Sequence, residues 1–179
     1  MADLKQFYTN EVVAKLEKEL DIKNPMAVPA LKKIVVNIGV KNATADKKAI
    51  EAAAEVLTNI TGQKAKVTAA KKSISSFKLR EGDKIGLVVT LRGKRMYDFF
   101  EKLVKIVLPR IKDFRGVKKT SFDAKGNYTL GLQEYIVFPE VDTGKVDRIQ
   151  GLEVIIVTSG QNNKEGFALL KALGMPFQK

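Results

Sequence analysis

The clearest secondary-structure signal in the chain is the segment from Ile85 to Arg92, IGLVVTLR, in which large apolar residues occupy every second position. Successive side chains of a strand point to opposite faces of a sheet, so this spacing predicts a half-covered β-strand. The residues expected on the covered face are Ile85, Leu87, Val89 and Leu91. The residues expected on the other face are Gly86, Val88, Thr90 and Arg92.

The same reading applied to the whole chain predicts an α+β fold. Apolar runs rich in β-branched residues predict further strands at 32–40, 64–68, 128–133 and 152–159. Apolar stripes at helical spacing predict helices at about 3–21, 45–60, 93–111 and 165–173. Long connections mixed with hairpins favour a mainly antiparallel sheet with helices packed on one face and the other face exposed. At 179 residues, with no linker or repeat, the chain is expected to form a single domain over 1–179.

The exposed face of this sheet is expected to be polar. Alternation along the strands places on it Val35, Asn37, Gly39, Thr90, Arg92, Thr129, Gly131 and Gln133. A solvated face is common in antiparallel sheets and by itself needs no ligand. Amide, hydroxyl and guanidinium groups also suit the sugar, base edges and phosphates of a nucleic acid. Paired aromatic residues are missing from this face, so shape and backbone contacts are favoured over base stacking.

The net positive charge of the chain is confined to its middle third. The whole sequence has 32 Lys and Arg against 20 Asp and Glu, a net charge of +12. Residues 61–120, here named the basic third, contain 17 basic and 5 acidic residues and therefore carry the whole excess. Charge that served only solubility would be spread along the chain, whereas a concentrated excess indicates a surface that binds a polyanion.

The composition excludes most catalytic chemistry. The chain has no cysteine and no histidine, which removes disulfides, the usual zinc ligands, thiol nucleophiles and imidazole proton transfer. A metal-dependent nuclease built on Asp98, Glu101 and Asp113 is the alternative class, and a Mg²⁺-dependent RNA cleavage assay separates it from a binding protein. Asp98 and Glu101 share a helix face, where charge balance with Lys94, Lys102 or Lys105 is the commoner role. We therefore expect no catalytic residues, no metal site and no cofactor.

A membrane role is the third alternative and the weakest. No segment approaches about 18 uninterrupted apolar residues, and the N-terminus MADLKQFYTNEVV lacks the apolar stretch of a signal peptide. Peripheral membrane binding calls for a basic amphipathic helix with exposed large apolar residues, but many of the basic residues lie on predicted loop and strand. A cytoplasmic protein without a membrane partner is expected.

A long basic stretch, TAAKKSISSFKLREGDK from Thr68 to Lys84, separates two predicted strands; we name it the basic loop. Loops of this length without secondary structure are usually functional or disordered. Its cations are Lys71, Lys72, Lys78, Arg80 and Lys84, and only Glu81 and Asp83 lie nearby to neutralise them. Ile74, Phe77 and Leu79 are expected either to pin the base of the loop or to form a small apolar cluster. The loop is interpreted as an RNA-contacting arm, with a disordered hairpin extension as the alternative.

A helix start at Gly93-Lys94-Arg95 offers another cationic position. Cations in a first helical turn oppose the helix dipole, and a phosphate docked on the free N–H groups would reverse that penalty. Two flexible side chains pointing into solvent remain an equal alternative.

The chain resembles a known family over nearly its whole length. The segments that carry the resemblance, in order, are VPALKKIVVNIGV, TGQKAKVT, KKSISSFKLREGDKIGLVVTLRGKRMYDFF, LPRIKDFRG, FDAKGNYTLG and LGMPF. They are similar to the bacterial large-subunit ribosomal protein five family, the 5S rRNA-binding proteins of the central protuberance. The combination of VTLRGKRM, RIKDFRG and FDAKGNYTLG is far more specific than any single short motif.

The resemblance implies a structural protein of the large ribosomal subunit whose partners are 5S rRNA, large-subunit rRNA, P-site tRNA, a protein in the small-subunit head and neighbouring large-subunit proteins. Matched by motif and supplemented by adjoining cations, the expected 5S rRNA contacts are Asn37, Gln63, Lys64, Lys66, Thr90, Arg92, Lys94 and Arg95. The basic loop resembles the family's arm that touches the elbow of P-site tRNA. Its expected contact residues are Lys71, Lys72, Ser73, Ser75, Ser76, Lys78 and Arg80.

Overall fold

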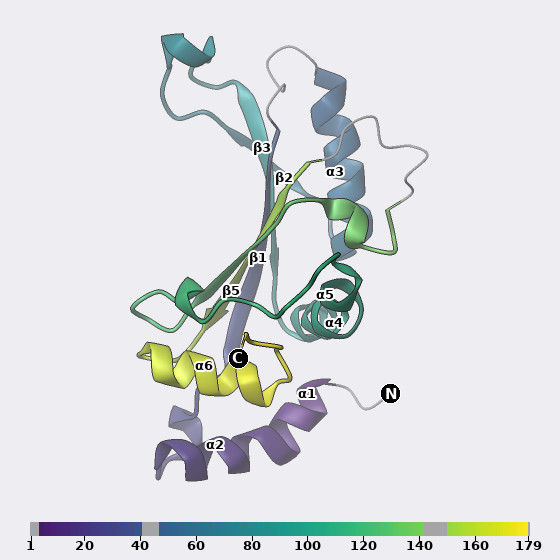
Figure 1. The fold of residues 1–179 in the computed structure, drawn as a ribbon. Coiled ribbons are helices and arrows are strands. Elements are labelled where there is room, and N and C mark those ends of the chain that lie inside the picture. The colour runs from purple at the N-terminus through teal and green to yellow at the C-terminus, as the bar shows by residue number, and fades with distance from the viewer. Residues whose placement is uncertain (1–3, 41–46, 142–149, 179) are drawn as a thin grey trace. The chain divides into compact units, whose positions relative to one another are not determined.

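Five strands form one sheet in the computed structural model, which describes residues 4–40, 47–141 and 150–178 (Figure 1). The strands are β1 (Leu31–Gly39), β2 (Lys66–Ala69), β3 (Lys84–Leu91), β4 (Tyr128–Leu132) and β5 (Leu152–Thr158). Their order in the sheet is β2-β3-β1-β5-β4, and β2 pairs with β3 in antiparallel register. The expected α+β class and the five expected strand positions are confirmed.

The helices also fall where the apolar stripes predict them. α1 (Leu4–Phe7), a π-helical turn at Tyr8–Val12 and α2 (Val13–Leu20) make one continuous helix. α4 (Lys94–Lys102), a π-helical turn at Leu103–Val107 and α5 (Leu108–Arg110) make another. The remaining helices are α3 (Lys47–Thr61) and α6 (Asn163–Ala172). The π-helical turns lie inside helices that the sequence predicts as regular.

The chain divides into two compact units, each built from several stretches of sequence. Unit 1 comprises residues 1–34, 91–130 and 155–179, and unit 2 comprises residues 35–90 and 131–154. Four strands, β1, β3, β4 and β5, contribute residues to both units. The single domain expected from the sequence stays a prediction.

In unit 2 the strands bury one face and leave the other partly open. Val36 and Ile38 of β1 and Leu87 of β3 are fully buried, whereas Asn37 and Thr90 are only half-buried. α3 covers the buried face with the side chains of Ile50, Ala53, Leu57 and Ile60. Helical spacing from the apolar residues of 45–60 predicts Ala49, Ala53, Val56 and Ile60 on this face. Ala53 and Ile60 are confirmed, whereas Ala49 and Val56 are only half-buried and the larger Ile50 and Leu57 are buried in their place.

Gly86 is the exception to the predicted alternation, because it is buried although it falls on the uncovered face. A Cβ at this position would lie 3.0 Å from the Ile38 carbonyl oxygen and 3.0 Å from Thr68 Oγ1. Thr68 stands opposite Gly86 in the β2–β3 register, and its side chain covers the glycine. The β1 backbone at Ile38 and the Thr68 side chain therefore leave little room for a side chain at this position.

In unit 1 the first helix is anchored through Tyr8, whose hydroxyl donates to the Pro29 carbonyl oxygen at 3.1 Å. Burial raises the pKa of Tyr8 to about 12. On this helix Val12 and Leu16 are fully buried, and α2 ends at Asp21 in the left-handed conformation with φ 52°. The second long helix buries Met96, Phe100, Leu103 and Val107, which recur at core-facing helical spacing.

The FDAKGNYTLG segment of unit 1 is held by a side-chain turn and a close backbone contact. Asp123 Oδ1 accepts from the backbone N–H groups of Lys125 and Asn127 at 2.9 and 2.8 Å, and the hydrogen bond from the Asn127 amide lowers the Asp123 pKa. The turn brings Gly126, with φ 74°, against α6. A Cβ at Gly166 would overlap the Gly126 carbonyl oxygen and lie 2.8 Å from Gly126 Cα.

We expect Gly166→Ala to lower the free energy of unfolding by about 1–3 kcal/mol, because the added methyl group meets backbone that cannot turn away. Gly131→Ala is the matched control, since a Cβ at Gly131 meets nothing within 4 Å. Urea unfolding followed by circular dichroism measures both changes. Equal stability of the two variants would show that the Gly126–Gly166 contact is not tight in solution.

Candidate nucleic-acid interface

Asn37 and Thr90 lie on the less buried face of unit 2, on the neighbouring strands β1 and β3. The Val40 N–H donates to the Ile85 carbonyl oxygen at 3.0 Å, which places the end of β1 beside the start of β3. Asn37 Nδ2 donates to Glu153 Oε2 on β5 at 3.3 Å, and this bond orients the amide. The Thr90 hydroxyl forms no hydrogen bond within the described residues, so it is free to donate and accept.

Gln63 lies beside Thr90 because α3 ends at Thr61, two residues before it. Gly62, with φ 65°, closes the helix by donating its N–H to the Thr58 carbonyl oxygen at 2.8 Å. The buried Thr61 hydroxyl donates to the Leu57 carbonyl oxygen at 2.7 Å and reinforces the same end. Gln63 Nε2 then donates to the Thr90 carbonyl oxygen at 3.3 Å. The structure thus brings together two predicted contact residues that are 27 positions apart.

Two cations border this group. Lys64 and Lys66 are exposed, and Lys66 stands opposite Val88 in the β2–β3 register. Residues directly opposite in a strand pair point to the same face, and Val88 belongs to the uncovered one. Lys66 therefore lies on the same face of the sheet as Thr90. Unit 2 supplies five of the predicted contacts: Asn37, Gln63, Lys64, Lys66 and Thr90.

Three further predicted contacts belong to unit 1. Arg92, Lys94 and Arg95 are exposed, and none of them forms an ion pair within the described part of the chain. Gly93, with φ 59° and ψ −136°, makes the sharp break that starts α4 directly after β3. The first turn of α4 has no acidic residue and no side-chain cap. The Met96 N–H donates to the Gly93 carbonyl oxygen at 3.2 Å, so the Lys94 and Arg95 N–H groups and side chains are left for an anion.

The basic loop is an ordered extension of the β2–β3 hairpin, which corrects the expectation of a long segment without regular structure. Its base is closed by hydrogen bonds from Ala70 N to Asp83 O (2.8 Å) and from Gly82 N to Ala70 O (3.0 Å). Nearer the tip, Ile74 and Leu79 form a β-bridge with bonds of 2.9 and 3.1 Å. A short 3₁₀ turn at Ser75–Phe77 completes the tip.

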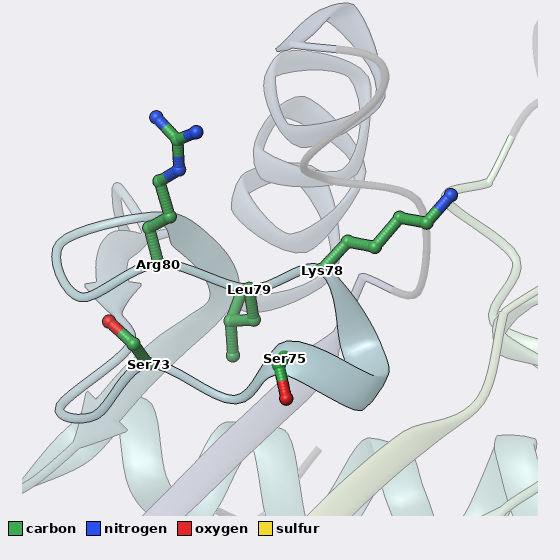
Figure 2. A pocket seen from close by; sticks show the side chains of 5 residues that line it. All are labelled: Ser73, Ser75, Lys78, Leu79 and Arg80. Atoms are coloured by element: carbon green, nitrogen blue, oxygen red, sulfur yellow. The ribbon is translucent and has the colours of Figure 1, made fainter.

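The cations of the basic loop are exposed, while its acidic and hydroxyl groups hold the backbone. Asp83 Oδ2 accepts from the Arg80 N–H at 2.7 Å, and Ser73 Oγ accepts from the Glu81 N–H at 2.9 Å. Five side chains line an open hollow beside the tip, and Figure 2 shows the Lys78 and Arg80 side chains extending from it in different directions. These lining residues are Ser73, Ser75, Lys78, Leu79 and Arg80. Among the residues described, no ion pair neutralises Lys71, Lys72, Lys78, Arg80 or Lys84.

Phe77 is a candidate contact residue whose exposure was not predicted from the sequence. Its apolar character predicts that it pins the loop or joins an apolar cluster, but its side chain is 74% exposed and Ile74 is 42% exposed. Only Leu79 of the three apolar residues is half-buried. One local feature of the sequence could have indicated this exposure: Phe77 lies between Ser76 and Lys78 and has no apolar neighbour on either side. Glu153, which orients Asn37, has no sequence signal at all.

The alternative roles gain no support from the geometry. Glu101 of the alternative carboxylate set pairs with Lys105, with 2.6 Å between Oε1 and Nζ, which confirms the expected charge balance on this helix. The described residues hold no group of three or more acidic side chains able to bind a metal ion. Nor does any helix among them have the length and apolar character needed to cross a membrane.

The uncovered face of unit 2 thus presents amide, hydroxyl and lysine groups, and the cations of the basic loop have no ion pair among the described residues. Residues 84–177 match the C-terminal model of the ribosomal L5 protein family, and residues 24–80 match ribosomal protein L5. The large ribosomal subunit protein uL5 of Desulfotalea psychrophila is 55% identical over 100% of both chains. That of Chloroflexus aurantiacus is 58% identical over 98% of this chain and 97% of its own. The chain therefore belongs to the ribosomal protein L5 family, a structural rather than an enzymatic one.

We expect Gln63→Ala to lower the free energy of unfolding by about 0.5–1.5 kcal/mol, because it removes the bond to the Thr90 carbonyl oxygen. Gln133→Ala is the matched control, since Gln133 is exposed on unit 2 and its removal should change stability by less than about 0.5 kcal/mol. Denaturant unfolding compares the two variants. Equal destabilisation would show that the Gln63–Thr90 bond does not hold this face together.

Proposed function

We propose that the protein, a structural constituent of the large ribosomal subunit without enzymatic activity, binds 5S rRNA and helps to form the central protuberance. Its relatives are large ribosomal subunit proteins, which assigns it to ribosomes in the cytoplasm. The observation that carries the proposal is the group on the uncovered face of unit 2, where Asn37 donates to Glu153, Gln63 donates to the Thr90 carbonyl oxygen and Lys66 lies on the same face. In this proposal the two units act together as one RNA-binding domain over residues 1–179.

Binding would rest on two kinds of contact. Lys64, Lys66, Lys94 and Arg95 neutralise phosphates and release counterions, which supplies most of the affinity. Asn37, Gln63 and Thr90 offer amide and hydroxyl groups to ribose 2′-OH groups and base edges, and Arg92 forks onto phosphate or guanine. Neither Asn37 nor Gln63 is a freely rotating side chain, because each donates a hydrogen bond within unit 2. The protein therefore meets RNA with these amides already oriented, which lowers the entropy cost of binding.

We expect the protein to prefer 5S rRNA over an unrelated RNA of similar length at near-physiological salt, and to lose that preference in Thr90→Ala and Arg92→Ala. For about six neutralised phosphates, the affinity for 5S rRNA should fall roughly a thousandfold between about 50 and 200 mM salt. Filter binding at several salt concentrations measures both effects.

Thr129→Ala is the control for Thr90→Ala, because Thr129 is an exposed threonine of β4 outside the predicted set of 5S rRNA contacts. If both RNAs bound alike, weakened together with salt and ignored the two substitutions, the basic third would be only a nonspecific polyanion surface.

We propose that the basic loop contacts the elbow of P-site tRNA. The loop has a fixed hairpin backbone, an exposed aromatic ring at its tip and five cations without an ion pair in the described chain. Lys78 and Arg80 suit phosphate contacts and Phe77 suits stacking on an exposed base, while Lys71, Lys72, Ser73, Ser75 and Ser76 complete the surface.

We expect Lys78→Gln/Arg80→Gln to weaken tRNA binding to the ribosomal P site roughly threefold to tenfold, because two phosphates are no longer neutralised, with 5S rRNA binding unchanged. Nitrocellulose binding of tRNA to ribosomes carrying the variant measures this. Lys15→Gln/Lys18→Gln removes the same charge from exposed positions on α2 and should leave tRNA binding intact. Equal weakening in both double variants would count against a specific loop contact.

The proposal extends to large-subunit rRNA, to neighbouring large-subunit proteins and to a bridge with a protein in the small-subunit head. We assign no residues to the bridge.

A further inference from the structure

Glu153 is an acidic side chain on the face of unit 2 to which the proposed function assigns RNA binding. Its neighbours along β5, Leu152 and Val154, are buried, so Glu153 lies on the uncovered face and is half-buried there. A carboxylate repels the phosphates of RNA, and no ion pair within the described chain neutralises this one. Within the same residues its one hydrogen bond is the 3.3 Å bond from Asn37 Nδ2. An anion at this position therefore needs an explanation.

The chemistry of this bond fixes which way the Asn37 amide points. An ionised carboxylate can only accept hydrogen bonds, so Glu153 requires the NH₂ group of Asn37 to face it. The amide oxygen Oδ1 of Asn37 then occupies the other branch of the side chain, where it accepts no hydrogen bond from the described residues. A glutamine in place of Glu153 would both donate and accept, and would leave the amide free to turn over. Glu153 therefore makes Asn37 an acceptor toward a ligand.

The surroundings of this pair are open but lack positive charge. The parts of β1 and β5 that belong to unit 2 carry no Lys or Arg. Lys66 lies on β2, and β3 separates that strand from β1. Gly39, two residues along β1 from Asn37, and Gly131, on the β4 strand next to β5, present no side chain, and a Cβ at either position would meet nothing within 4 Å. A ligand can therefore approach the pair without meeting a cation of these strands.

A neutral hydrogen-bond donor is the group that fits this site. RNA offers two kinds of such donor, the ribose 2′-OH and the exocyclic amino group of a base, and both can donate to Asn37 Oδ1. A phosphate oxygen is itself an acceptor, so it would face the oxygen of Asn37 and a carboxylate of its own sign. Phosphate contacts are left to the exposed Lys64 and Lys66, away from β1 and β5.

We propose that Glu153 is a positioning residue that sets the specificity of this face: it repels phosphate and holds Asn37 as the acceptor for a ribose 2′-OH or a base amino group of the bound RNA. This role rests on the proposed function, because it concerns the RNA bound at that site. The carboxylate lowers the affinity of the face for RNA in general. It raises the affinity for an RNA that presents a donor to Asn37.

The test removes the carboxylate and compares two RNAs. Filter binding measures the affinity of the full-length protein for 5S rRNA and for an unrelated RNA of similar length, at near-physiological salt. The variant is Glu153→Ala, and its control is Glu55→Ala, which removes the same charge from an exposed position of α3, on the helix that covers the opposite face. Loss of negative charge alone would tighten the binding of both RNAs. We expect Glu153→Ala instead to weaken 5S rRNA binding about threefold to tenfold relative to the control, while the unrelated RNA binds equally or more tightly.

Asn37→Ala shows whether Glu153 acts through the amide. In that background Glu153→Ala should no longer weaken 5S rRNA binding, because no amide is left to orient. Glu153→Gln keeps the size of the side chain but imposes no direction on the amide, so it should reduce the preference for 5S rRNA as Glu153→Ala does. Thermal melting checks that every variant folds. If Glu153→Ala weakened 5S rRNA binding equally with and without the Asn37 amide, the positioning role would be overturned.

Substituted 5S rRNA identifies the donor. One pool carries sparse 2′-deoxynucleotides, and a second carries sparse nucleotides whose base lacks its amino group, such as inosine for guanosine. We expect substitutions in one pool to weaken binding to the wild-type protein but to have no effect on binding to Asn37→Ala. An effect in the first pool identifies a ribose, and one in the second pool identifies a base. Identical patterns for the two proteins in both pools would overturn the proposal.

A failure of the proposed function gives a different result. A wild-type protein without any preference for 5S rRNA would overturn the proposed function and the role of Glu153 with it. A wild-type preference that Glu153→Ala leaves at the level of Glu55→Ala would overturn the role of Glu153 alone.

Discussion

Burial of every second side chain along β1 is the constraint on which the rest of the structure depends. β1 is third in the order of five strands, contributes to both units, and buries Ile34, Val36 and Ile38 completely. Because the side-chain period of a strand is two, burying these residues forces Asn37 onto the opposite face. β3 places Thr90 in the same way through Leu87 and Val89. A slip of one residue would bury both polar side chains, so core packing sets the register of the candidate site.

The elements of the fold could be predicted because their signals are local. Strand alternation and helical stripes locate each strand and helix to within a few residues, since the patterns follow from burial of one face. The buried position of Gly86 could not be predicted, because it depends on the β2–β3 pairing that sets Thr68 over it. The π-helical turns at Tyr8–Val12 and Leu103–Val107 could not be predicted from the sequence either, because one extra residue in a turn leaves the apolar stripe almost unchanged.

The candidate site was predictable residue by residue but not as a set of contacts. Asn37 and Glu153 are 116 positions apart in the sequence, and Gln63 and Thr90 are 27 apart. No local sequence pattern therefore predicts either hydrogen bond. The Phe77 prediction was wrong for a related reason. An apolar residue is assumed to be buried until the structure shows that the hairpin tip has no core to receive it, and here the bridge between Ile74 and Leu79 holds the tip by backbone bonds instead.

The use of the acidic residues explains why the positive charge remains available for binding. Of the five acidic residues in the basic third, Asp83 accepts a hydrogen bond from loop backbone and Glu101 pairs with Lys105. These carboxylates stabilise local structure and do not neutralise the cations of the basic loop. The backbone of the basic loop is also fixed by hydrogen bonds. Most of the ordering that RNA binding would otherwise require is therefore already present in the folded chain, and counterion release is opposed mainly by the reduced rotamer freedom of the bound side chains.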